Sequence, residues 1–158
     1  GHLGLFNQRP WVITPNEKTD HNAIEIVKKI ACNLGSKLIQ TNAQKHDEAV
    51  ALISHLPVII SAALLRTIGE QKDPYIIELS KNLASSGFQD TSRVGGGNPE
   101  LGSSMAEYNS SAIIRALSSY RWSLEQLEGA LLSENWPQLF NELKLTKLIR
   151  EDFMKDSS

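Results

Sequence analysis

The residues best suited to bind a ligand lie in one polar stretch, residues 85–102, which joins two predicted helices. Its one basic residue is Arg93, whose forked guanidinium suits a carboxylate or a phosphate. The glycines at 95–97 let backbone N–H groups approach a ligand closely, and Asn98 stands at the positive N-terminal end of the next helix. The stretch therefore predicts a small-anion site. The alternative is a flexible linker in which Arg93 pairs with Asp90.

Other chemically active residues are weaker candidates. His46-Asp47 and His55 suggest a histidine–aspartate metal hydrolase, but the two histidines are nine residues apart and point to opposite faces of a helix unless Pro57 kinks it. The single cysteine, Cys32, excludes a disulfide framework and a cysteine-based zinc site. A dinucleotide fingerprint is absent, because Glu100 stands where the third glycine would be needed. We therefore expect no metal and no cofactor bound to this chain.

The elements that must position these residues are helical almost throughout. The chain has 158 residues, 41% of them hydrophobic, which fits one folded domain. Caps and apolar spacing predict helices from Thr19 or Asp20 to Leu34, from Thr41 or Asn42 to about Ile68 with a kink near Ser54, from Asp73-Pro74 to Gly87, from Asn98-Pro99 to about Leu132 with a break or drift around 109–111, and from about Asn135 to Met154.

Extended structure is predicted at two places near the start of the chain. Trp11-Val12-Ile13-Thr14-Pro15 has the composition of a short strand closed by proline. A lone strand is not stable, so we expect this one to have packed against something upstream, as the tail of a missing domain. The segment 36–41 is too short for a helix and is either a strand or an extended link.

Apolar residues predict a partner subunit. The segment 49–65 is apolar nearly all round, and a stripe spaced by four and three residues runs from Ile113 to Leu131. Together they exceed what one small domain should bury, which predicts a two-fold dimer. The alternative is that the final helix covers the stripe.

The charge and hydropathy of the chain limit which other partners it can bind and where in the cell it is expected. A net charge of −2 and a pI near 6.1 give no basic face for nucleic acid. The longest apolar run, Val58–Leu65 with Ser61 inside it, is far shorter than the roughly 20 residues of a membrane span. We therefore expect a cytoplasmic protein that binds neither nucleic acid nor a membrane.

Three separated blocks of this sequence resemble the arogenate/prephenate dehydrogenases of tyrosine biosynthesis, with the cyanobacterial, arogenate-preferring type nearest. The blocks are Ser-Gly-Phe-Gln-Asp-Thr-Ser-Arg-Val-Gly-Gly-Gly-Asn-Pro-Glu-Leu-Gly at 86–102, His46-Asp47 with Ser54-His55-Leu56-Pro57, and Arg9-Pro10-Trp11-Val12-Ile13-Thr14-Pro15. The last matches the segment that closes the family's nucleotide-binding domain. The resemblance runs from about Leu5 to Trp136.

The resemblance implies an all-α fold of the 6-phosphogluconate-dehydrogenase C-terminal type, with a short N-terminal strand left from a missing Rossmann domain. In the family this helical domain forms an intertwined dimer and lines the substrate pocket. Residues 1–16 would then end the nucleotide-binding domain and its linker, and residues 17–158 would form the helical domain. The family's catalytic histidine lies outside this chain, so no residue here is predicted to be catalytic.

The resemblance also implies an activity for the full-length protein: oxidative decarboxylation of arogenate or prephenate with NADP or NAD. This chain alone should be inactive. Arg93 would hold a substrate carboxylate and His55 would face the same pocket, although Val58 stands where some bacterial relatives carry a second histidine. The other substrate-binding candidates are Gly87, Asp90, Ser92 and Asn98. The alternative from another functional class is a purely structural helical dimerisation module.

Overall fold

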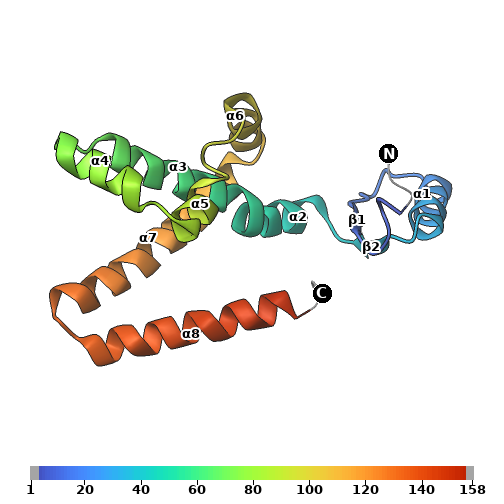
Figure 1. Ribbon diagram of the computed structural model, residues 1–158. Coiled ribbons are helices and arrows are strands. Elements are labelled where there is room, and N and C mark those ends of the chain that lie inside the picture. Colours follow the sequence, from blue (N-terminus) through green and yellow to red (C-terminus); the bar gives the residue numbers. More distant parts are fainter. Residues whose placement is uncertain (1–3, 156–158) are drawn as a thin grey trace. The chain divides into compact units, whose positions relative to one another are not determined.

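The computed structural model describes residues 4–155 as a short parallel strand pair and a series of helices (Figure 1). It confirms the predicted helical fold class. The elements are β1 (Pro10–Ile13), α1 (His21–Asn33), β2 (Lys37–Gln40), α2 (Ala43–Val50), the π-helical turn η1 (Ala51–His55), α3 (Leu56–Gly69), α4 (Pro74–Leu83), α5 (Ser86–Ser92), α6 (Pro99–Tyr108), α7 (Ser110–Leu132) and α8 (Trp136–Met154). The chain forms two compact units, residues 1–113 and 114–158.

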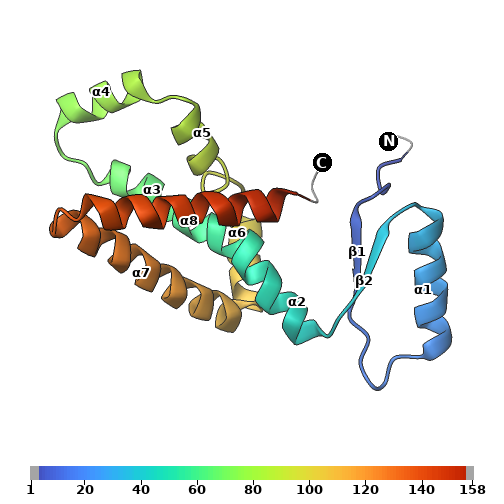
Figure 2. The same ribbon diagram turned by 90° about the horizontal axis from the view of Figure 1, so that it is seen from below.

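The N-terminal strand has its partner within the chain. β1 pairs in parallel with β2, so that Trp11 lies opposite Leu38 and Ile13 opposite Gln40. Helix α1 connects the two strands and lies beside them (Figure 2). A partner for this strand was expected upstream, whereas the structure provides one some 27 residues later in the chain. The segment 36–41 contains this partner strand, so the strand alternative is the correct one for that segment.

Helices α2 and α3 form one helical segment with a wide turn between them. Asn42 caps its start, with the side-chain Oδ1 accepting a hydrogen bond from the backbone N–H of Lys45 at 2.8 Å. The kink predicted near Ser54 is a π-helical turn, in which the Leu56 N–H reaches back to the Ala51 carbonyl. Pro57 follows directly and has no N–H to donate, which explains why regular α-helical bonding is interrupted here.

This segment is not buried by the chain itself. Within the 27 residues Ala43–Gly69, a stretch of 18 residues has a mean hydropathy of 1.9, and only 11% of that stretch is buried. By length and composition alone such a helix could cross a membrane, but a helix in the core of a water-soluble protein meets the same criterion. Leu52 and Ile53 are 56% and 65% exposed. Within the described part of the chain, this segment is therefore not covered on every side.

The later helices begin where caps were predicted, but one of them ends early. Asp73 caps α4 by accepting from the N–H of Tyr75 at 2.9 Å. This helix ends at Leu83, not at Gly87, which instead lies in the first turn of the short helix α5. The predicted break around 109–111 is present, since α6 ends at Tyr108 and α7 begins at Ser110.

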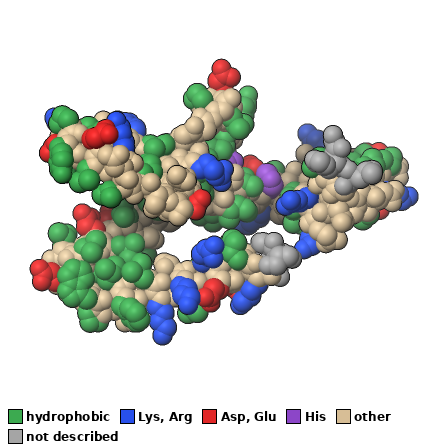
Figure 3. All heavy atoms as spheres, viewed as in Figure 1, with side chains coloured by type: hydrophobic (Ala, Val, Ile, Leu, Met, Phe, Trp, Pro, Cys, Tyr) green, Lys and Arg blue, Asp and Glu red, His purple; other side chains and the backbone are tan. Residues whose placement is uncertain are grey.

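The second unit, residues 114–158, consists of most of α7 and all of α8 in the part that the structure describes. Hydrophobic side chains gather on the surface over the turn between these helices (Figure 3). Leu132 is 80% exposed, and Trp136 and Phe140 are also exposed. Leu124 and Leu131 of the predicted stripe remain about half exposed, so α8 does not cover the whole stripe.

Candidate functional site

A buried hydroxyl group attaches the end of α5 to helix α3. Ser61 of α3 is 2% exposed, and its Oγ donates a hydrogen bond to the Thr91 carbonyl at 2.7 Å. The same Oγ accepts a hydrogen bond from the backbone N–H of Gly95 at 2.8 Å. Both hydrogen-bonding functions of the hydroxyl are thus used inside the protein. The backbone is held on either side of Arg93, which lies midway between Thr91 and Gly95.

Gly95 allows this close approach. A Cβ atom at position 95 would overlap the backbone N of Ala62 and lie 2.6 Å from Ser61 Oγ. By contrast, a Cβ at Gly96 would have its nearest neighbour, Leu65 Cδ1, at an ordinary 3.7 Å. The sequence interpretation of the glycines as a ligand cradle therefore needs correction at position 95. Its backbone N–H is directed at Ser61, and its missing side chain makes room for a helix.

The guanidinium of Arg93 has no carboxylate partner among residues 4–155. The residue follows α5 directly and is exposed. Some other cations pair with a carboxylate three or four residues away, as Lys28 does with Glu25 at 3.0 Å. This hydrogen bond and the charge of Lys28 lower the pKa of Glu25. Across residues 4–155, no ion pair joins Arg93 to Asp90 or to another carboxylate. The alternative in which Arg93 braces Asp90 is therefore not supported.

Three of the other candidates from the polar stretch lie on α5, where a loop was expected, and Asn98 lies at the start of α6, where a cap was expected. Gly87, Asp90 and Ser92 belong to α5. The Ser92 hydroxyl donates to the Phe88 carbonyl of the same helix at 2.7 Å. Asn98 caps α6, with Oδ1 accepting from the Glu100 N–H at 2.8 Å. Ser92 and Asn98 thus use polar atoms in local helix structure, whereas the charge of Arg93 remains available to a ligand.

His55 lies in the π-helical turn and is held by an asparagine from the break between α6 and α7. Asn109 Nδ2 lies 3.2 Å from His55 Nδ1 and donates to the Asp47 carbonyl at 2.8 Å. All three residues are half-buried. His46 contacts the side chain of its neighbour Asp47 at 3.0 Å. No group of three or more metal-ligating side chains occurs within the described residues, so the metal-hydrolase alternative gains no support.

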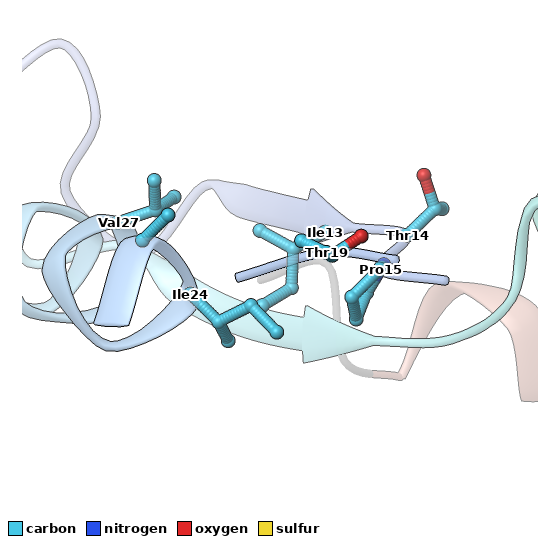
Figure 4. A pocket seen from close by; sticks show the side chains of 7 residues that line it. Ile13, Thr14, Pro15, Thr19, Ile24 and Val27 are labelled. Carbon is cyan, nitrogen blue, oxygen red and sulfur yellow. The ribbon is translucent and has the colours of Figure 1, made fainter. Parts of the chain in front are cut away.

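Two cavities of the first unit are lined by residues other than the predicted site residues. One of about 250 Å³ lies between the end of β1 and α1, where Ile24 and Val27 lie near Ile13 (Figure 4). The other, of about 540 Å³, is lined by the end of α3 together with α4 and the start of α5. Within the described part of the chain, no hydrogen bond links Arg93 to His55.

Sequence reasoning missed two residues of this region, although each left a signal. Ser61 is the one polar residue in the apolar run 58–65, and a hydroxyl in such a place needs a buried partner. Asn109 falls at the predicted helix break around 109–111, which indicated the interruption but not the contact with His55.

Comparisons with known proteins agree on one family. The family model described as prephenate dehydrogenase, dimerization domain, matches residues 42–145. The structure is similar to that of arogenate dehydrogenase from Synechocystis, with a TM-score of 0.90 and 45% sequence identity over 95% of this chain and 54% of that one. Prephenate dehydrogenase of Bacillus subtilis (strain 168) is 24% identical over 93% of this chain and 39% of the relative.

A third comparison extends the likeness of the fold. The crystal structure of prephenate dehydrogenase from Aquifex aeolicus, in complex with hydroxyphenyl propionate and NAD+, has a TM-score of 0.85. It is 23% identical over 95% of this chain and 52% of that one, so this likeness concerns the fold. The chain thus spans about half or less of the length of the relatives named here.

Proposed function

Because the chain belongs to the prephenate dehydrogenase dimerization-domain family, we propose that it is the substrate-binding and dimerisation half of an arogenate or prephenate dehydrogenase. The family match over residues 42–145 carries this proposal. The full protein would catalyse a nicotinamide-dependent oxidative decarboxylation in tyrosine biosynthesis, in the cytoplasm. The residues present here do not fit a nicotinamide cofactor, because they lack the glycine fingerprint. NADP or NAD would bind the part of the protein that this chain does not span.

The substrate carboxylate is assigned to Arg93. Two observations support this role: the guanidinium has no carboxylate partner among the described residues, and the backbone around it is anchored through Ser61. A bidentate arginine–carboxylate pair provides two parallel charge-assisted hydrogen bonds. His55 would contribute a second contact in the assembled site, while Gly87, Asp90, Ser92 and Asn98 would shape the segment that carries Arg93.

We place the boundary of the helical domain near Thr41, which is later than the division after residue 16 suggested by sequence. Two observations support the later boundary. β1 and β2 share a sheet, so residues 10–40 form one strand–helix–strand unit, and the family match begins at residue 42. In this proposal the strand pair belongs with the nucleotide-binding half; residues 1–3 of that half lie outside the described residues.

The activity proposal is tested by comparing this chain with the protein encoded by the complete gene. We expect the complete protein to oxidise arogenate or prephenate, measured as absorbance of reduced nicotinamide. The 158-residue chain should give no turnover with either substrate and either cofactor, because it has no nucleotide fingerprint. Turnover by the chain alone would contradict the proposed division of labour. A complete protein that is inactive on both substrates would contradict the proposed function.

The proposed homodimer is tested by sedimentation. A second copy of the chain would cover two exposed apolar surfaces, one around Leu124 and Leu131 and the other around Leu52 and Ile53. The proposal includes no nucleic-acid or membrane partner. We expect the chain to sediment as a dimer at micromolar concentration, with an interface above the standard size of about 1,600 Å². A monomer under these conditions would contradict the assignment of these surfaces to a partner subunit.

A further inference from the structure

The contact between Asn109 and His55 defines which atoms carry hydrogen. Asn109 Nδ2 lies 2.8 Å from the Asp47 carbonyl oxygen. A carbonyl oxygen only accepts hydrogen bonds, so the side-chain atom of Asn109 at this place must be the amide nitrogen and not the amide oxygen. The Asp47 carbonyl therefore fixes the orientation of the Asn109 amide by chemistry.

The same nitrogen then determines the tautomer of His55. An amide nitrogen carries two hydrogens and accepts none, and Asn109 Nδ2 lies 3.2 Å from His55 Nδ1. With one hydrogen directed at Asp47, the other is available to Nδ1, which must therefore present a lone pair. In a neutral imidazole the proton then resides on Nε2. Among the described residues, Nε2 has no hydrogen-bond partner, so this N–H is free to donate.

We propose that Asn109 is a positioning residue that holds neutral His55 as the Nε2–H tautomer, so that the ring offers a hydrogen-bond donor to an acceptor oxygen of the substrate. The proposal rests on the proposed function, which places His55 at the substrate site. The other tautomer would direct a lone pair at a carboxylate or carbonyl oxygen and would repel it. The helix break at Asn109 brings its side-chain amide within hydrogen-bonding distance of the Asp47 carbonyl oxygen and of His55 Nδ1.

Histidine nitrogen NMR on the 158-residue chain tests the tautomer without reference to activity. At a pH where the ring is neutral, long-range proton–nitrogen correlations distinguish a protonated from an unprotonated ring nitrogen. The signals of His55 are assigned with a His55→Gln variant, since the chain has four histidines. We expect a protonated Nε2 and an unprotonated Nδ1. A protonated Nδ1 in the unsubstituted chain would overturn the proposal.

Two variants of Asn109 test whether this residue determines the tautomer of His55. Asn109→Asp replaces the donor by a carboxylate that only accepts, so the proton should move to Nδ1. Asn109→Leu removes the donor and should leave a mixture of tautomers. An unchanged Nε2–H preference in both variants would overturn the role of Asn109. Melting curves show whether each variant is folded. If neither variant folds, the spectrum of the unsubstituted chain still tests the tautomer of His55.

Kinetics of the complete protein separate this inference from the proposed function. Asn109→Asp should raise the substrate KM about tenfold, the scale of losing a hydrogen bond to a charged group, and leave the cofactor KM unchanged. A changed tautomer with an unchanged substrate KM would refute the proposed contact of His55 with substrate while leaving the tautomer assignment intact. An unchanged tautomer with a raised KM would refute the positioning role alone.

Discussion

Arg93→Ala in the complete protein should weaken substrate affinity by roughly 2–4 kcal/mol, the scale for removing one partner of a desolvated charge pair. The guanidinium has no competing carboxylate among the described residues, so its loss leaves the substrate carboxylate without its directional cation. Affinity for the nicotinamide cofactor should hardly change, because we assign that site to the other half of the protein. Steady-state kinetics with substrate and cofactor varied in turn measure both effects.

Controls for Arg93 separate binding from folding. Arg93→Lys keeps the charge but loses the fork, so it should also be impaired. Arg66→Ala removes a different exposed arginine, one that pairs with Glu70 at 2.9 Å, and should leave the substrate KM unchanged. An unchanged substrate KM for Arg93→Ala, beside a lowered melting temperature, would show that Arg93 supports the fold and does not bind the substrate.

Gly95→Ala should lower the free energy of unfolding of the chain by about 3 kcal/mol, at the upper end for overpacking. The added methyl group would overlap the backbone N of Ala62 and crowd Ser61 Oγ. A backbone atom cannot move aside by changing a rotamer, so α3 and the end of α5 must separate, and the two hydrogen bonds of Ser61 are strained together. Urea unfolding followed by circular dichroism measures the loss.

The neighbouring glycine provides a matched control for this substitution. Gly96→Ala adds the same methyl group at a position where the nearest atom lies at ordinary contact distance. We expect it to be neutral or stabilising by up to about 1 kcal/mol, because alanine restricts the unfolded chain. Equal losses for both variants would show that the segment needs glycine for backbone freedom, and that contact with α3 is not the reason.

Features that depend on residues close together in the chain, such as helix caps, could be predicted from the sequence alone. Asn42, Asp73 and Asn98 were recognisable as caps because the side chain bonds to backbone N–H groups only two or three residues later. The break predicted around residues 109–111 is likewise present, between α6 and α7. Gly87 was misleading, because the same residue type that follows many helices also fits the first turn of a new one.

Contacts between distant residues were not predictable from one sequence. Ser61 and Thr91 are separated by 30 positions, and His55 and Asn109 by 54, so no local pattern records their pairing. The parallel pairing of β1 with β2 was missed for the same reason. Sequence therefore identified Arg93 as a candidate by its residue type, whereas its anchoring through Ser61 was visible only in the structure.

The π-helical turn Ala51–His55 lets the long helical segment contain one extra residue without rotating its two halves away from each other. A π-helical turn accommodates one more residue than an α-helical turn within about the same rotation. If regular α-helix contained the same extra residue, α2 would be rotated by about 100° relative to α3, one residue's share of a 3.6-residue turn. Asp47 and His55 would then no longer face the same Asn109 amide. The wide turn therefore sets the register between these two residues.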